Sequence, residues 1–154
     1  MAYDRDQLTN PERRLPDIRL PRGSDGENRA LRPAPRSSRV IFLAHGHGCA
    51  QCAAYARSLA VAEADLSEWD ARLLVISRDP MEAGPEVETL LDTDGRVERA
   101  LSLRPPAVLV VDEWGQVHHT SASDDSHSLP GAAELVSWAR YLAIQCPECQ
   151  GEAL

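Results

Sequence analysis

The sequence contains no lysine: all 16 basic residues of the 154-residue chain are arginines. Since Schiff-base catalysis requires a lysine amine, that chemistry is excluded. No apolar run approaches the ~20 residues that a membrane-spanning helix needs. The N-terminal residues 1–6 also lack the apolar segment of a signal peptide. We therefore predict a cytoplasmic protein with no membrane partner.

The charge balance is acidic, with 24 Asp and Glu residues and a net charge of −8. The arginines are interspersed with acids, whereas nucleic-acid binding requires a cationic face, so nucleic acid is not an expected partner. A phosphate-binding glycine loop is also missing, because residues 45–48, His-Gly-His-Gly, do not fit the dinucleotide-binding pattern. No organic cofactor is therefore predicted.

The chain is arranged around a strand-to-helix corner that carries two cysteines. Residues 40–44 form an apolar, β-prone run that ends at glycines, and residues 53–60 are good helix formers. Cys49 and Cys52 lie between them in a Cys-x-x-Cys spacing. The first amides of a helix lack intrahelical partners and its dipole favours a thiolate there, so Cys49 is the predicted attacking sulfur. Cys52, one turn further along, is placed to resolve a mixed disulfide.

Two histidines and a proline complete the predicted site. His45 and His47, just upstream of Cys49, are placed to add positive charge or to transfer a proton. Residues 104–112, Arg-Pro-Pro-Ala-Val-Leu-Val-Val-Asp, put two prolines before an apolar run. The order strand, Cys-x-x-Cys, helix, proline, strand resembles the thioredoxin-like superfamily. Within it, the redoxin branch, which includes the alkyl-hydroperoxide-reductase-like proteins, is the nearest in pattern.

The resemblance implies an α/β thioredoxin-like fold, with a central mixed sheet flanked by helices and an N-terminal β-hairpin. It also implies that Pro106 is the cis-proline that shapes the groove for substrate backbone. Residues 15–31, which turn at a Gly-Ser-Asp-Gly segment, fit the hairpin. We predict a flexible arm over 1–14, a thioredoxin-like domain over 15–145 and a tail over 146–154.

The remaining pattern predicts the elements of the domain. Continuous apolar runs at 39–44 and 71–77 are typical of strands that are covered on both faces. Asp92 is expected to cap the helix that follows it. Further strands are predicted at 88–92, 108–111 and 116–120, and helices at 52–64, at 93–101 and from 131 onward. The last helix is expected to bury Leu135, Trp138, Leu142 and Ile144.

A second Cys-x-x-Cys pair, Cys146 and Cys149, follows the last helix and departs from the family's pattern. The two pairs together would supply a tetrahedral zinc site. In a thioredoxin-like sheet, however, the last helix ends at the edge opposite the first pair. The favoured alternatives are a separate dithiol or a metal site, with zinc the candidate, shared between the subunits of a homodimer. A tail without a role also remains open.

The predicted function is thiol–disulfide exchange with a protein partner, either a disulfide substrate or a reductant. Peroxiredoxins carry proline and Thr or Ser at fixed positions before the reactive cysteine, and Phe42 and Gly46 occupy those positions here. A thiol peroxidase is therefore disfavoured. A zinc-binding or redox-silent interaction module on the same scaffold is the other alternative. Gly48 replaces the tryptophan of many thioredoxins, and no buried acid is identifiable as proton acceptor for Cys52, which suggests a dedicated partner.

Overall fold

A computed structural model of the chain describes residues 13–46, 48–81, 83–123 and 128–145. In these residues, five strands form a central sheet in the order β5-β4-β3-β6-β7. The strands are β3 (Ser38–Leu43), β4 (Ala71–Ser77), β5 (Glu88–Leu91), β6 (Ala107–Val111) and β7 (Val117–Ala122). β3, β4 and β5 are parallel, whereas β6 is antiparallel to β3 and β7 is antiparallel to β6. The predicted mixed sheet is confirmed.

β3 is buried on both faces, as its apolar run predicts. Successive side chains of a strand point to opposite faces. Val40 and Phe42 therefore belong to one hydrophobic cluster, and Ile41 and Leu43 belong to another. All four side chains are at most 1% exposed. The sheet thus separates two apolar layers, each of which must be covered by other elements.

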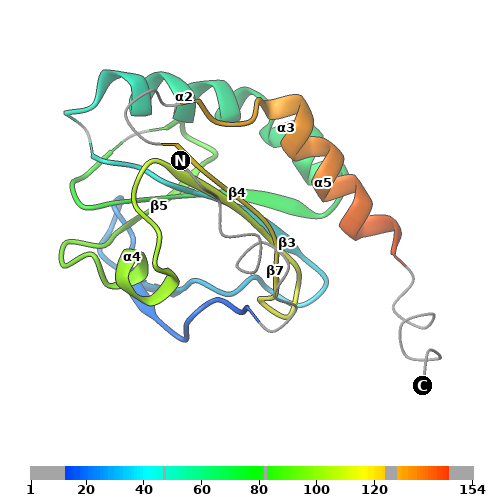
Figure 1. The fold of residues 1–154 in the computed structure, drawn as a ribbon, viewed down its shortest axis with the longest axis horizontal. Helices are drawn as coiled ribbons and strands as arrows, with labels where there is room; N and C mark the ends of the chain where they lie inside the picture. The colour runs from blue at the N-terminus through cyan, green and yellow to red at the C-terminus, as the bar shows by residue number, and fades with distance from the viewer. Residues whose placement is uncertain (1–12, 47, 82, 124–127, 146–154) are drawn as a thin grey trace.

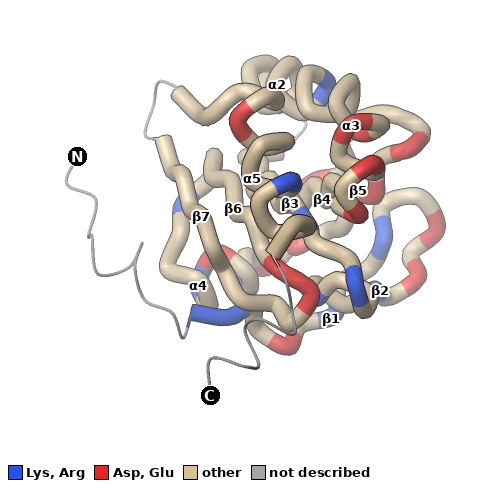
Figure 2. The backbone as a smooth tube through the Cα atoms, turned by 90° about the vertical axis from the view of Figure 1, so that its right-hand side faces the viewer, with Lys and Arg blue, Asp and Glu red and all other residues tan. Residues whose placement is uncertain are grey.

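Helices cover the face of the sheet that Phe42 occupies (Figure 1). They are α2 (Ala50–Val61), α3 (Glu63–Glu68) and α5 (Ala132–Ile144). Figure 2 shows α2 and α3 above the strands, which follow one another from β7 to β5. No helix among the described residues is long and apolar enough to span a membrane.

The opposite face is covered by α4 (Arg96–Leu101) and by a two-stranded antiparallel hairpin. The hairpin consists of β1 (Arg19–Pro21) and β2 (Asn28–Ala30), and it lies below the sheet in Figure 2. The predicted hairpin before the first central strand is therefore confirmed. It contributes the buried Leu20 to the core on this side.

The N-terminal arm is only partly covered by the described residues, because residues 1–12 lie outside them. Arg13 and Arg14 are both paired with the sheet. The carbonyl of Arg13 accepts a hydrogen bond from the N–H of Val117 at 2.9 Å, and Arg14 forms an antiparallel bridge with Gln116. The last two residues of the predicted arm, Arg13 and Arg14, are therefore in contact with the domain.

The helix after the cysteine corner ends earlier than predicted. The sequence pattern predicts a helix to about Ala64, but α2 ends at Val61 and the separate helix α3 follows. Between them the backbone leaves the helical conformation, with φ −87° and ψ 1°. The break turns the buried Glu63 toward β4, where its carboxylate accepts from the Arg72 side chain (2.8 Å) and the Leu73 N–H (3.0 Å). Part of the predicted connector to β4 is therefore helical.

Asp92 caps α4 as predicted, although the helix begins three residues later than residue 93. The buried Asp92 carboxylate accepts hydrogen bonds from the N–H groups of Arg96 (2.8 Å) and Val97 (2.9 Å). Those two amides belong to the first turn and have no intrahelical partner. The cap therefore reaches the helix across a short turn instead of adjoining it.

The buried stripe of α5 differs from the prediction at its end. Leu135 and Ala139 are buried, and Trp138 and Leu142 are half-buried. Ile144 is 63% exposed, so the prediction that it is buried is wrong. The reason is that the last turn of α5 extends past the sheet (Figure 1).

The turn between β6 and β7 is organised by one buried carboxylate, Asp112. It accepts hydrogen bonds from the N–H groups of Trp114 and Gln116, each at 2.9 Å, and contacts Nε2 of His118 at 2.8 Å. Burial acts to raise the pKa of Asp112, but the hydrogen bonds from His118 and the two amides outweigh it. The pKa of Asp112 therefore lies below its usual value.

We expect Asp112→Asn to lower the free energy of unfolding by ~1–3 kcal/mol near neutral pH, because charged hydrogen bonds are lost. A carboxylate with a lowered folded-state pKa contributes stability that is present above the unfolded value of about 4. That stability is lost as the pH falls through the folded value. Thermal melts should therefore show a difference between wild type and variant that shrinks below about pH 4. Asp17→Asn, at an exposed position, is the control, and a difference that stays constant down to strong acid would contradict the assignment.

Candidate dithiol site

The sheet register brings three segments that are far apart in the sequence to one edge. Leu43 pairs with Ile76 of parallel β4 and with Ala107 of antiparallel β6. The chain therefore leaves β3 and β4 at the same edge at which it enters β6. The cysteine corner, the loop after β4 and Pro106 all lie there. The cysteine corner and the loop after β4 are therefore neighbours.

Pro106 is the residue that directly precedes β6. The Pro105–Pro106 peptide bond is cis, as predicted. Pro106 is buried, and its carbonyl accepts a hydrogen bond from the N–H of Ser123 at 3.1 Å. Its predicted role in binding substrate backbone stays a prediction.

Cys49 is the N-cap residue of α2, at the predicted corner between strand and helix. Its Sγ accepts a hydrogen bond from the N–H of Cys52 at 3.3 Å, so it satisfies an amide that has no intrahelical partner. The side chain is half-buried. A molecule that approaches from solvent can therefore contact this sulfur.

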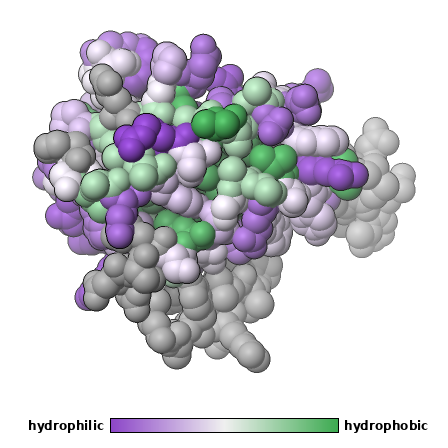
Figure 3. All heavy atoms as spheres, turned by 90° about the horizontal axis from the view of Figure 1, so that it is seen from above, coloured by the Kyte–Doolittle hydropathy of each residue, from purple (hydrophilic) through white to green (hydrophobic). Residues whose placement is uncertain are grey.

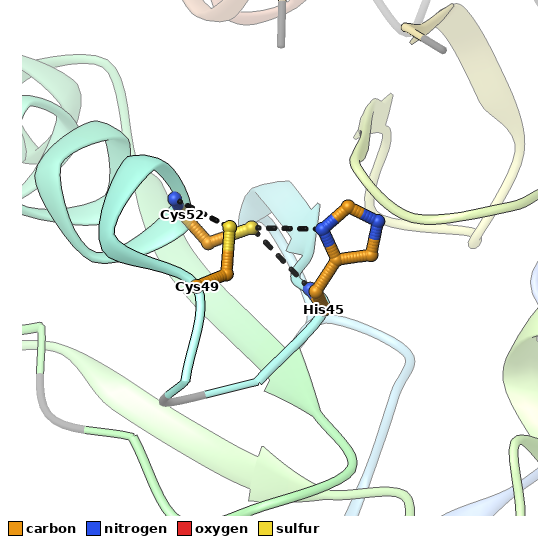
Figure 4. A group of neighbouring side chains, drawn as sticks. All are labelled: His45, Cys49 and Cys52. Carbon is orange, nitrogen blue, oxygen red and sulfur yellow. Dashed lines mark hydrogen bonds between the residues drawn. The ribbon is translucent and has the colours of Figure 1, made fainter. Parts of the chain in front are cut away.

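Cys52 is fully buried, at 0% exposure, and two nitrogen atoms of His45 contact its sulfur. The backbone N–H of His45 donates to Sγ at 3.4 Å, and the ring Nδ1 lies 3.6 Å from the same atom. Figure 4 shows the imidazole turned toward the sulfurs. Burial raises the pKa of Cys52 to about 11, and neighbouring Cys49 adds to this rise while the His45 N–H opposes it. Cys52 is therefore a protonated thiol at neutral pH.

Gly46 is the tight point of the corner, and Asp79 of the loop after β4 packs against it. The backbone of Gly46 has φ +143°, a conformation that residues with a side chain rarely adopt. A Cβ at this position would lie 2.7 Å from Oδ2 of Asp79. Nothing in the sequence pattern singles out Asp79, because its place depends on how the two loops pack.

Three residues of the predicted site lie outside the described residues: His47, Cys146 and Cys149. Their proposed roles, in proton transfer for His47 and as a second dithiol or zinc ligands for Cys146 and Cys149, stay predictions. Of the predicted set, the structure brings His45, Cys49 and Cys52 together and places Pro106 at the same edge of the sheet.

Two contacts show in which direction α5 runs relative to the cysteine corner. Just before it begins, the carbonyl of Pro130 accepts a hydrogen bond from the Tyr55 hydroxyl of α2 at 2.6 Å. Toward its end, the Arg140 guanidinium lies 5.6 Å from the ring centroid of Trp69, which directly follows α3 and precedes β4. Since β4 begins at the edge opposite the cysteine corner, α5 runs away from that corner (Figure 1).

In the described part of the chain, His45, Cys49 and Cys52 also form a group of possible metal ligands. One ligand atom from each, an imidazole nitrogen and two sulfurs, lies within 4.8 Å of the others. Sulfur and imidazole nitrogen are the ligands that zinc takes in proteins. The site can therefore be considered both as a dithiol and as part of a metal centre.

A mixed sheet of this order, with a Cys-x-x-Cys pair at the start of the helix after its central strand, defines a thioredoxin-like fold. The solved structure of AhpC from Enterococcus faecalis is similar, with a TM-score of 0.73 and 15% identity over 84% of this chain and 89% of that chain. Xanthomonas campestris peroxiredoxin Q gives a TM-score of 0.71 and 17% identity over 88% and 99% of the two chains.

A secreted thiol-disulfide isomerase from Corynebacterium glutamicum is similar to the same degree. It gives a TM-score of 0.70 and 17% identity over 85% of this chain and 86% of that chain. No protein-family model and no curated protein sequence matches the chain. Similarity at these identities establishes the fold, and the reaction must be argued from the site itself.

We expect Gly46→Ala to destabilise the protein by ~1–3 kcal/mol, because alanine is strained at this φ and its Cβ meets Asp79. For a domain of this size the melting temperature should fall by about 2–4 °C per kcal/mol. Gly48→Ala is the matched control two residues away, since a Cβ there has no atom within 4 Å. Equal melting temperatures of the two variants would show that the corner is not built around Gly46.

Proposed function

We propose that this protein is a thiol–disulfide oxidoreductase that uses Cys49 and Cys52. The observation that supports the proposal is the unequal burial of two sulfurs one helical turn apart: Cys49 is half-buried and Cys52 is fully buried. An attacking sulfur must reach a partner molecule, whereas a resolving sulfur must reach only the mixed disulfide. The half-buried Cys49 is therefore suited to the attack, and the fully buried Cys52 is suited to the resolving step.

In the first step, the Cys49 thiolate attacks one sulfur of a partner disulfide. The partner's S–S bond breaks, a mixed disulfide forms at Cys49, and the partner's other sulfur leaves as a thiolate. The position of Cys49 at the N-cap of α2 keeps its sulfur beside the backbone N–H of Cys52 during this step.

In the second step, Cys52 loses its proton and attacks Sγ of Cys49. This attack breaks the mixed disulfide, releases the partner's second thiolate and leaves a Cys49–Cys52 disulfide, so two electrons have passed to the partner. Because the pKa of Cys52 is raised to about 11, the step needs a proton acceptor. His45 is placed for this task, since its Nδ1 lies 3.6 Å from the Cys52 sulfur and its ring is exposed to water. A dithiol reductant then returns the two electrons.

The surface beside Cys49 suits a protein partner. α2 carries a single charged residue, Arg57, and its exposed positions include Ala50, Ala54 and Val61. Viewed from the side of α2, the molecule shows hydrophobic patches among polar ones (Figure 3). The free energy needed to desolvate a surface is small when the surface carries few charges, so another protein can cover it readily. We infer that the substrate disulfide belongs to a protein.

Thiol peroxidase is the alternative that the structural relatives raise, since they include AhpC and peroxiredoxin Q. At the positions where peroxiredoxins carry proline and Thr or Ser, this chain has Phe42 and Gly46. Phe42 is fully buried and packs edge-on against Tyr55, with ring centroids 4.8 Å apart. Gly46 has no side chain, so neither residue offers a polar group to a peroxide. Disulfide exchange therefore has the stronger support.

We expect Cys52→Ser to accumulate a mixed disulfide through Cys49, because the resolving thiol is missing. The test uses the Cys146→Ser/Cys149→Ser background, so that the tail cysteines do not react, and oxidised glutathione as the disulfide. Intact-mass measurement should show one glutathione per chain. Cys49→Ser should react at least about tenfold more slowly, since at pH 7 only about one buried Cys52 in 10⁴ is a thiolate.

Equal adduct formation by the two single-cysteine variants would remove the assigned roles. The parent chain with both cysteines should instead form an internal disulfide when it is treated with the oxidant diamide. Intact-mass measurement should detect the bridge as the loss of two hydrogen atoms. If no such bridge forms, the redox-silent alternative is favoured.

We expect hydrogen peroxide to oxidise Cys49 no faster than it oxidises glutathione at the same pH, because Phe42 and Gly46 offer no polar group at the two positions that peroxiredoxins use. Stopped-flow measurement with both reactants gives the comparison. A rate constant orders of magnitude above that of glutathione would reassign the protein as a thiol peroxidase.

A further inference from the structure

We propose that the reduced protein binds one zinc ion through His45, Cys49 and Cys52. This inference goes beyond disulfide exchange and does not depend on it, although the cysteines are shared. It also differs from a zinc site built by Cys146 and Cys149, since all three ligands lie at the cysteine corner. The metal-binding atoms belong to a loop residue, a helix N-cap and the first turn of α2.

The geometry fits a tetrahedral ion with little rearrangement. With Zn–S near 2.3 Å and Zn–N near 2.0 Å, a tetrahedron has S···N edges of about 3.6 Å and S···S edges of about 3.8 Å. The distance between Nδ1 of His45 and Sγ of Cys52 is 3.6 Å. All three ligand atoms lie within 4.8 Å of one another, so the S···S contact needs to close by at most about 1.0 Å and the second S···N contact by at most about 1.2 Å.

The surroundings of the sulfurs also suit bound thiolates. Sγ of Cys49 accepts from the N–H of Cys52, and Sγ of Cys52 accepts from the N–H of His45. Hydrogen bonds of this kind orient metal ligands and compensate part of the charge on a thiolate. The His45 residue is exposed, and its Nδ1 is turned toward the two sulfurs (Figure 4). Three protein ligands then leave a fourth position for water or an incoming thiol.

Zinc and the Cys49–Cys52 disulfide are mutually exclusive states of one site. Zinc binding releases the two thiol protons to solvent and leaves both sulfurs reduced. Disulfide formation passes two electrons to an oxidant and removes both thiolate ligands. Zinc therefore holds the dithiol in its reduced form until an oxidant or a partner disulfide displaces the metal.

The test is a zinc titration of the reduced Cys146→Ser/Cys149→Ser chain, in competition with a chromophoric chelator under anaerobic conditions. We expect one zinc per chain. In this background His45→Ala, whose side chain is exposed and whose loss should not unfold the domain, should weaken zinc binding. The loss should be at least the roughly 10–100-fold that removal of an outer partner of a metal ligand causes.

Cys49→Ser should weaken zinc binding further, and His118→Ala is the matched control. His118 pairs with Asp112 near the edge of the sheet opposite the corner, so its removal should leave zinc affinity unchanged. Binding of cobalt(II) in place of zinc should add a sulfur-to-metal charge-transfer band that disappears in Cys49→Ser.

Absence of zinc from the background chain would overturn the proposal, and unchanged affinity in His45→Ala would overturn the three-ligand site. Failure of the exchange reaction in glutathione trapping, with zinc still bound, would leave the metal site standing. Conversely, trapping without zinc binding would leave only the oxidoreductase. The two proposals therefore fail independently.

Discussion

The pairing of β3 with strands on both sides is the constraint on which the rest of the structure depends. Its backbone is hydrogen-bonded to β4 and β6, and its side chains enter both hydrophobic layers. If such a strand moved along its axis or shifted its register by one residue, its apolar side chains would no longer match the layers that bury them. The point at which β3 ends at Leu43 therefore fixes where the chain emerges from the core, and with it the location of the cysteine corner.

The corner itself reconciles two opposing requirements. Cys52 must be buried for α2 to pack on the sheet, and burial disfavours its thiolate. The same sulfur nevertheless accepts a hydrogen bond from the N–H of His45 and lies beside its imidazole, and the proposed proton transfer rests on these contacts. Asp79, of the loop after β4, packs against Gly46 in this corner. Packing, and not the Cys-x-x-Cys spacing alone, gives the two sulfurs different chemistry.

The end of α5 and the cysteine corner lie at opposite ends of the sheet's strands. The contact of Arg140 with Trp69 places the end of this helix at the far edge of the sheet, and its last turn extends into solvent with Ile144 exposed. A histidine beside the first pair offers a third ligand without any contribution from the tail. The described part of the chain thus ends, at Gln145, away from the cysteine corner.

The sequence by itself determined the elements whose signals are local. Continuous apolar runs predicted β3 and β4, helix formers after the glycines predicted α2 with Cys49 at its start, and the carboxylate of Asp92 predicted the cap of α4. The resemblance to redoxins predicted the hairpin, the mixed sheet and the cis bond before Pro106. The two strands, the helix and the cap depend on residue type and spacing within a few residues, which a sequence displays directly.

Only the tertiary structure decided the features that depend on residues far apart in the chain. The helix breaks after α2 because Glu63 bonds to Leu73 of β4, and Asp79 lies against Gly46 because the register of β3 and β4 brings their ends together. The exposed imidazole of His45 places its Nδ1 3.6 Å from the Cys52 sulfur, and both proposed roles of this residue rest on that contact. A side chain's partner across the fold leaves no periodic signal in the sequence, because the free energy of the contact depends on where packing places both groups.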